Sequence, residues 1–474
     1  MKLRPAATAL SLAATACVVS CSLFAPINRL HPTDPQAFLK DYDRQWLEVL
    51  KLKTLFSWLQ DNSIETFKEM RAHRPIITTA PVPTKAGLKF TSTVLVANRQ
   101  DVVEVLDKWD TFTVRLYGSK MDECMGAYML GRDHTRYNLV EKPYMRHLMP
   151  PSDFPRIKRQ VVSLAHKAIA EGTQTTTDKN GKAIGRIEIV NKVARRVPIL
   201  LTGTYGGFPG PDEASMFRWS RATQADFFKN IKAEPPIHAD AIRAGHEMTA
   251  YIDSLITEKR ALLTQNPEAE DTILARMLKQ GTNKVQGITD DRMIILTAGL
   301  LIGAGETTQA AVCKCLTELF TRPAELQGAI KAARENNDDL LGRYVWEALR
   351  FRPGNSVLPR YAEQDYILAK GTPRETKIAK GSLVLAGTQS AMFDETFVKN
   401  PEQFRLDRPQ SMYMILGYGW HRCLGDHISL IQVPQIIKAL LLKKNLRPAP
   451  GKQGEINQKG GPFPEQYILE YDRN

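Results

Sequence analysis

A largely apolar segment between residues 290 and 320 constrains the fold of this chain more than any other feature of the sequence. Apolar residues occupy nearly all of its helical positions, so a helix formed there has no broad polar face to turn toward water. Thr289 or Asp290 is suited to cap the start of that helix. We therefore expect a long helix that runs through the interior of a large domain.

The remaining segments predict a mainly α fold with a smaller β-rich part. Helical periodicity covers residues 34–73, 101–109, 187–202, 212–231, 237–264 and 323–350, and strand-like runs occur at 91–96 and within 355–389. Residues 118–130 are rich in Gly and Met and lack periodicity, which predicts a long loop. Because no linker-like composition follows residue 40, residues 34–474 are expected to form one domain.

The distribution of charge argues against a nucleic-acid-binding protein, and the cysteine content argues against a disulfide-rich one. The formal net charge of +13 favours an acidic partner or an anionic membrane surface. The basic residues are scattered and form no nucleic-acid motif, so we expect no nucleic-acid binding. The six cysteines are too sparse and irregular for a disulfide framework. Cys313 and Cys315 are two apart on the expected long helix, and we interpret both as buried thiols.

The first 25 residues predict contact with a membrane. A basic start, MKLR, precedes an uncharged segment that extends to Ala25. The tetrapeptide VVSC, ending at Cys21, resembles a bacterial lipobox, in which cleavage precedes a cysteine that becomes lipid-modified. An uncleaved anchor is the second interpretation, since about twenty uncharged residues suffice to cross a bilayer. A misassigned start codon, which would make the protein cytoplasmic, is the third.

The strongest candidate for chemistry is the loop of residues 416–425, LGYGWHRCLG, in which glycines flank a single cysteine. A helix is expected to begin at Cys423, and the free backbone N–H groups of a helix N-terminus lower the proton affinity of a thiol. Gly417 and Gly419 let the backbone approach a flat ligand, and Gly425 leaves room beyond the sulfur. A single cysteine is more often an inert buried residue, but this loop favours a ligand.

The loop resembles the haem-binding loop of the cytochrome P-450 family, F-G-x-G-x-[HR]-x-C-x-G. The matching residues are Gly417, Gly419, His421, Cys423 and Gly425, while Leu416 stands where the family has an aromatic residue. The resemblance implies the cytochrome P-450 fold, with haem b buried between the long helix and the cysteine loop. It also implies that Cys423 ligates the iron as a thiolate and that His421 contacts a haem propionate.

A second motif lies inside the long helix, at residues 303–308. Glycine weakens a helix and a buried carboxylate needs a partner, so these residues cost stability. They resemble the family's oxygen-activation motif, [AG]-G-x-[DE]-T, which implies that Gly303 and Ala304 lie against the haem. By the same resemblance Glu306 and Thr307 are catalytic and deliver protons for oxygen activation. The structural alternative is a Thr307 bonded to a carbonyl four residues earlier and a Glu306 at the surface.

Three further segments match the family around the haem. Glu347 and Arg350 form an E-x-x-R pair, and Arg408 is the expected third member of a buried network that holds the cysteine loop. His134 matches the histidine of the H-T-R-L-R segment, although the second arginine is absent at residue 138. The resemblance makes Arg360 a substitute cation for a haem propionate.

The resemblance implies a monooxygenase that inserts one oxygen atom of O2 into an apolar small molecule. No flavin or iron–sulfur motif is present, so the electrons are expected from a separate ferredoxin or flavoprotein. Residues 112–130, 203–212 and the long helix near Leu300 are the expected walls of the substrate site, and they leave the substrate unidentified. The basic residues expected to dock an acidic donor are Arg422, Lys438, Lys443 and Lys444.

Two other functions remain open at this point. A peroxide-driven member of the same family usually replaces the acid–alcohol pair, so Glu306 and Thr307 argue against that function. A non-catalytic haem-binding sensor would suit an exported protein, because cytosolic electron donors are absent outside the cell.

Overall fold

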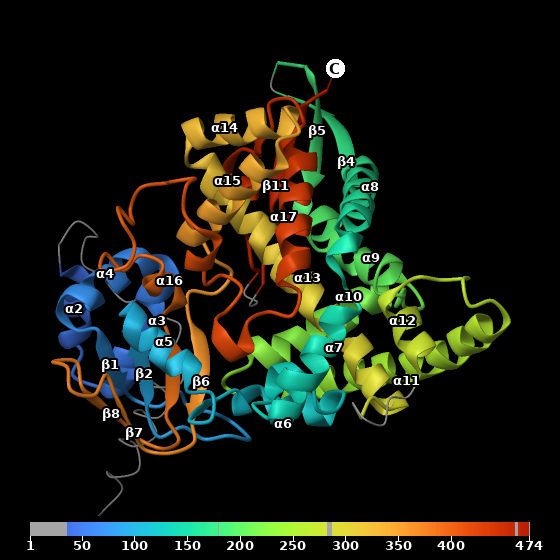
Figure 1. Cartoon of the computed structure of the whole chain (residues 1–474). Helices are drawn as coiled ribbons and strands as arrows, with labels where there is room; N and C mark the ends of the chain where they lie inside the picture. Colours follow the sequence, from blue (N-terminus) through green and yellow to red (C-terminus); the bar gives the residue numbers. More distant parts are fainter. Residues whose placement is uncertain (1–35, 179, 282–286, 460–462, 474) are drawn as a thin grey trace, which may run out of the picture.

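Helix α13 (Asp290–Phe320) runs through the interior of the protein, with the bounds expected from the sequence (Figure 1). Thr289 caps its start, because its side-chain oxygen accepts a hydrogen bond from the Arg292 backbone N–H. Among the described residues α13 is the one helix long and apolar enough to cross a membrane, and 61% of its most apolar window is buried within the protein. It is therefore the core helix that the apolar pattern predicts.

The computed structural model describes residues 36–473, apart from 179, 282–286 and 460–462. The expected signal or anchor, residues 1–25, lies outside the described residues. The helices before α13 are α2 (Ala37–Asp43), α3 (Glu48–Asp61), α4 (Ser63–His73), α5 (Arg99–Asp107), α6 (Arg115–Cys124), α7 (Lys142–His147), α8 (Phe154–Gly172), α9 (Arg196–Thr204), α10 (Glu213–Gln224), α11 (Pro235–Gln265) and α12 (Ile273–Gln280). Those after it are α14 (Pro323–Arg334), α15 (Asp338–Phe351), α16 (Thr388–Ala391) and α17 (Asp426–Leu441). Short π-helical turns include η2 (Arg136–Glu141), η4 (Val190–Ala194) and η5 (Ala225–Lys229).

The β-rich part consists of small sheets, as expected. One sheet has the order β1-β2-β9-β6-β3, in which β2 and β9 are parallel and the other pairs are antiparallel. A second has the order β10-β11-β5-β4, and β7 and β8 form a third. The strands are β1 (Ile76–Thr79), β2 (Thr93–Val96), β3 (Phe112–Thr113), β4 (Thr173–Thr177), β5 (Ala183–Glu188), β6 (Leu358–Ala362), β7 (Tyr366–Leu368), β8 (Thr376–Ile378), β9 (Leu383–Ala386), β10 (Arg447–Pro448) and β11 (Ile468–Asp472).

The expectation of a long loop over residues 118–130 is wrong. Most of its first half belongs to α6, whose buried side chains Tyr117, Met121 and Cys124 recur at helical spacing. Gly118 breaks the sequence pattern but is needed for packing, because a Cβ there would lie 2.7 Å from the Gly131 carbonyl oxygen. The glycine therefore marks a close approach of two segments within the fold.

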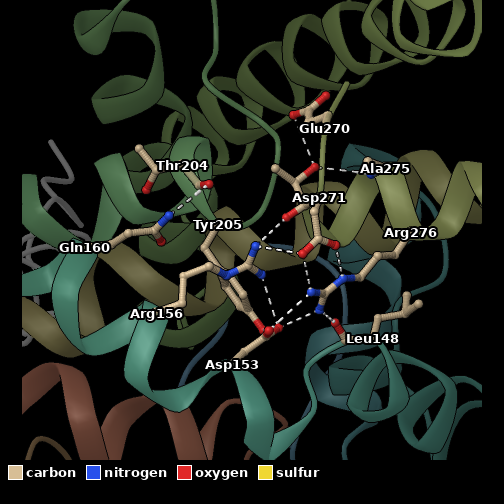
Figure 2. Close-up of polar contacts among 11 residues, drawn as sticks. Leu148, Asp153, Arg156, Gln160, Thr204, Tyr205, Glu270, Asp271, Ala275 and Arg276 are labelled. Atoms are coloured by element: carbon tan, nitrogen blue, oxygen red, sulfur yellow. Dashed lines mark hydrogen bonds and ion pairs between the residues drawn. The ribbon is translucent and has the colours of Figure 1, made fainter. Parts of the chain in front are cut away.

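A dense ion network joins the start of α8 to α12 (Figure 2). Arg276 of α12 contacts Asp153 at 2.5 Å and Asp271 at 2.6 Å, and Arg156 of α8 contacts Asp271 at 2.9 Å. The Tyr205 hydroxyl donates to Asp153 at 2.8 Å. The network therefore ties the start of α8 to the segment that leads into α12.

Candidate active site

The cysteine loop places Cys423 just before α17, whose N-cap is Gly425. Gly417 and Gly419 have φ values of +80° and +57°, a region that residues with a Cβ rarely adopt. The Cys423 backbone N–H donates to the Leu416 carbonyl at 2.8 Å and closes the loop. The glycines predicted to shape this loop therefore do so through their backbone conformation.

Two cations from α7 hold the same loop, and no sequence motif marked them. The Lys142 Nζ donates to the carbonyl oxygens of Trp420 and Arg422 at 3.1 and 2.5 Å. Arg146 donates to the carbonyl oxygen of Cys423 at 2.9 Å. These charge-assisted bonds fix the backbone on both sides of the sulfur.

The low proton affinity expected of the Cys423 thiol remains a prediction, because opposing influences act on its pKa. Burial raises the pKa of this thiol, and the Gly425 backbone N–H, Lys142 and Arg146 oppose the rise without cancelling it. Desolvation disfavours the charged thiolate, whereas the local donors favour it. Cys313 and Cys315 are confirmed as buried thiols, with pKa values raised by burial.

Helix α13 has one accessible face, although most of its residues are buried. Gly303 and Thr307 are exposed in the middle of the helix, and a Cβ built on Gly303 would meet nothing within 4 Å. The partly accessible positions recur at three- and four-residue spacing, so they lie on one side of the helix. This accessible face consists of Leu300, Gly303, Ala304, Thr307, Ala310, Ala311 and Lys314.

Thr307 presents its hydroxyl on the accessible face of α13. The hydroxyl donates to the Gly303 carbonyl oxygen at 2.7 Å, which is the back-bond of the structural alternative. Its oxygen can still accept a hydrogen bond, because a hydroxyl has one donor and two acceptor sites. Thr307 therefore remains able to contact a ligand on this face.

Glu306 is fully buried, so its alternative interpretation as a surface acid is wrong. Its carboxylate accepts from Arg195 at 2.6 Å and lies 3.2 Å from Arg221. Arg221 also pairs with Glu465 at 3.1 Å. Burial raises the pKa of Glu306, and the two arginines oppose that rise. The sequence gives no sign of which cations would meet this acid.

The expected buried network of Glu347, Arg350 and Arg408 is confirmed, and its further partners lie in the segment that precedes the cysteine loop. Glu347 accepts from Arg350 at 2.7 Å, from Arg408 at 3.1 Å and from the Tyr413 hydroxyl at 2.9 Å. Arg350 also donates to the Pro401 carbonyl oxygen at 2.7 Å. Every strong donor is thus satisfied within the fold, which is typical of a structural network.

Arg360 is buried without an anionic partner among the described residues. It is 3% exposed, its one hydrogen bond goes to the Pro359 carbonyl oxygen at 2.9 Å, and its Nε has no partner in the described part of the chain. Burial lowers the pKa of His421, the hydrogen bond to Asp133 opposes that change, and the nearby charge of Arg360 lowers the pKa further. The His421 Nε2 meets Asp133 at 2.8 Å. Asp133 therefore lies near both groups, but among the described residues it contacts His421 and leaves Arg360 without an ion pair.

Two predicted residues lie elsewhere. His134 is exposed, and its Nδ1 accepts from the backbone N–H of Arg136 at 3.1 Å, within the same turn. Lys438 was expected on a docking surface, and that expectation is wrong because it is buried and pairs with Asp338 at 2.7 Å. Arg422 pairs with Asp426 at 2.8 Å.

Known proteins share both sequence and fold with the chain. The match to "Psi-producing oxygenase A" of Emericella nidulans is 36% identical over 135 residues, which span 28% of this chain and 12% of that protein. "Mycinamicin IV hydroxylase/epoxidase" of Micromonospora griseorubida is 24% identical over 67% of this chain and 77% of its own length. The structure of CYP109E1 from Bacillus megaterium in complex with testosterone has a TM-score of 0.64 and 20% identity, covering 87% of this chain and 100% of that chain.

The family assignment comes from a separate comparison. The model that describes the family Cytochrome P-450 matches residues 213–466, which include α13, the buried Glu347 network and the cysteine loop. The match covers more than half of the 474 residues. The chain belongs to the cytochrome P-450 family.

Proposed function

We propose that the chain is a haem-thiolate monooxygenase that inserts one oxygen atom of O2 into an apolar small molecule. The observation that carries this proposal is that one fold holds a braced Cys423 loop and also leaves a face of the otherwise buried helix α13 accessible. Electrons come from a separate ferredoxin or flavoprotein. The similarity to a hydroxylase/epoxidase and to a steroid C26-monooxygenase supports the reaction class.

The residues fit haem b, the cofactor that the family implies. Cys423 would supply the axial sulfur, and the small side chains Gly303 and Ala304 leave room on α13. Arg360 and His421 would bind the haem propionates, which explains a buried guanidinium with no carboxylate beside it among the described residues. His134 would contact a haem propionate only if its exposed ring turned inward. When bound, haem with a thiolate ligand supplies the oxygen-activating centre.

The chain's own groups can carry protons toward the accessible face of α13. Glu465 is partly accessible and pairs with Arg221, which lies beside the buried Glu306. Because burial raises the pKa of Glu306, its carboxyl holds a proton more readily than a solvated one. Thr307, the next residue, offers a hydroxyl on the accessible face. We assign Glu306 the proton supply and Thr307 the final contact.

The proposal is tested with Thr307→Ala, using a surrogate ferredoxin and reductase as electron donors. We expect a larger share of electrons to appear as hydrogen peroxide, with product per electron lowered by about tenfold or more. Thr317→Ala is the matched control, because Thr317 makes the same kind of back-bond, to Cys313 at 2.9 Å on the same helix. An unchanged share of peroxide in Thr307→Ala would contradict the catalytic assignment.

We also propose that residues 1–25 attach the protein to a membrane. The lipobox-like VVSC supports a lipid-modified Cys21, and the uncharged segment supports an uncleaved anchor. Mass spectrometry of the mature N-terminus distinguishes the two forms. Detection of an unmodified, uncleaved chain in the cytoplasmic fraction would contradict both.

A further inference from the structure

Two lysines meet the same short segment next to the accessible face of α13. Lys314, on α13, donates from Nζ to the carbonyl oxygens of Pro353 and Gly354 at 2.7 and 3.2 Å. Lys229, the last residue of η5, donates from Nζ to the Asn355 side-chain oxygen at 2.8 Å. Two ammonium groups from separate elements therefore converge on residues 353–355.

Neither lysine has a carboxylate within ion-pairing distance in the described part of the chain. Burial lowers the pKa of Lys314 to about 8, and the charges of Lys229 and Arg352 lower it further. Arg352 is itself paired with Glu318 at 3.3 Å. Burial also lowers the pKa of Lys229. Two like charges are thus kept close together at a cost that no acid among the described residues offsets.

The two lysines are placed relative to α13 by their contacts with residues 353–355. The Lys229 side chain keeps accessible surface, so its ammonium group can be reached by a ligand. Lys314 follows Thr307 by seven residues, which is about two helical turns, so both lie on the same side of α13. The lysines therefore stand at one end of the accessible face of α13.

Donor capacity remains at both nitrogens. An ammonium group has three donors, of which Lys229 uses one and Lys314 uses two in bonds to the described residues. The Phe463 ring lies 6.0 Å from the Lys229 Nζ and supplies an apolar wall beside the charge. A negatively charged group placed between the two nitrogens would satisfy the free donors and remove the repulsion between them.

We infer that Lys229 and Lys314 bind a carboxylate at one end of the substrate, while its apolar body lies along the accessible face of α13. This inference rests on the proposed function, because it takes that face as the substrate site. Seven helical residues span about 10 Å. The oxidised carbon, near Thr307, is therefore expected several bonds away from the carboxylate.

The test is a binding measurement on the haem-loaded protein with matched probes. Dodecanoate, 5β-cholanate and 1-naphthylacetate are each compared with their methyl esters by calorimetry and by the change in the haem absorption spectrum. We expect wild type to bind at least one acid about tenfold or more tightly than its ester. Lys229→Met and Lys314→Met should each remove that preference and leave ester binding within about twofold.

Lys331→Met is the matched control, because Lys331 is an exposed lysine on α14 and should leave the preference intact. Lys229→Met keeps the test decisive if Lys314→Met fails to fold, since the Lys229 side chain is accessible. The inference is overturned if no acid is preferred over its ester, or if the variants weaken acid and ester equally. Failure of the proposed function is separate, because the thiolate signature of the haem and the peroxide share of Thr307→Ala need no acid.

Discussion

Arg350 and Arg360 are ten positions apart in sequence and both buried, with exposed fractions of 0% and 3%, yet their surroundings are opposite. Arg350 contacts the Glu347 carboxylate and backbone carbonyls, including that of Pro401. Arg360 has one backbone acceptor and a free Nε among the described residues. Burial lowers the pKa of both guanidinium groups. Glu347 opposes the change at Arg350 through a direct hydrogen bond, whereas Tyr117 and Asp133 oppose it at Arg360 only through their charge.

The difference separates charges that build the fold from charges that await a ligand. A buried cation with its acid in place needs nothing further, whereas a buried cation without one has been desolvated at a cost. The same contrast holds between Lys438, which pairs with Asp338, and Lys314, which pairs with no carboxylate of the described residues. We therefore interpret Arg360 and Lys314 as ligand-binding cations and Arg350 and Lys438 as structural ones.

Removing the acid of the structural network should have the largest effect. Glu347→Ala leaves Arg350 and Arg408 buried without their shared carboxylate, and we expect the free energy of unfolding to fall by about 3–5 kcal/mol. Urea denaturation measures the change. The control is Glu335→Ala, at an exposed carboxylate, which should change stability by less than about 0.5 kcal/mol. Equal losses of unfolding free energy in the two variants would contradict a structural role for the Glu347 network.

Replacing Arg360, which has no ion pair among the described residues, should weaken haem binding more than it destabilises the fold. Arg360→Met is expected to speed haem loss by about tenfold to a hundredfold, because a charged hydrogen bond contributes about 1.5–3 kcal/mol. Transfer of haem to excess apomyoglobin gives the rate. The melting temperature, followed by far-UV circular dichroism, should fall more in Arg350→Met than in Arg360→Met, because Arg350→Met breaks the Glu347 network. A haem-loss rate equal to wild type in Arg360→Met would show that this cation does not hold the cofactor.

The pH dependence of acid binding sharpens the contrast at Lys314. Its pKa of about 8 lies below the ordinary lysine value, so its charge is present below pH 8 and is lost as the pH rises through that value. The affinity for a carboxylic acid probe should then fall by about tenfold between pH 7 and pH 9, a loss of about 1.4 kcal/mol, while the affinity for its ester stays level. In Lys229→Met the midpoint should move upward, because one repelling charge is gone. An affinity for the acid probe that does not change between pH 7 and pH 9 would contradict a role for the Lys314 charge in binding.

Two glycines of α13 provide the smallest test. Gly303→Ala should raise the free energy of unfolding by about 0.5–1 kcal/mol, because the site is open and alanine favours the helix. Gly299→Ala should lower it by about 1–3 kcal/mol, because its Cβ would clash with the Tyr128 ring. Thermal denaturation compares the two variants. The same sign for both would mean that the accessible face of α13 is not open at Gly303.

The sequence predicted the parts of the molecule that depend on local pattern. The bounds of α13 follow from its continuous apolar run and the capping Thr289. The Glu347 network follows from the spacing of Arg350 and from Arg408, which the family resemblance supplied. The bounds of α13 could be predicted from neighbouring residues, and the Glu347 network from motifs that occur in a fixed order along the chain.

The parts that were not predicted depend on contacts between distant segments. The partners of Glu306 are Arg195 and Arg221, more than eighty residues before it, and no motif marks either. Strand β11 pairs with β5, hundreds of residues earlier. The raised pKa of Cys423 depends on desolvation by the surrounding fold, which a loop sequence does not report. Long-range packing determines these features.

The central claim is that the Cys423 sulfur ligates the haem iron. The purified protein, reduced with dithionite and exposed to carbon monoxide, should show the strongly red-shifted Soret band of a thiolate-ligated haem. Cys313→Ala changes a buried thiol away from the cysteine loop and should keep that band. Cys423→Ala should lose it, and a Cys423→Ala protein that retains the band would contradict the account.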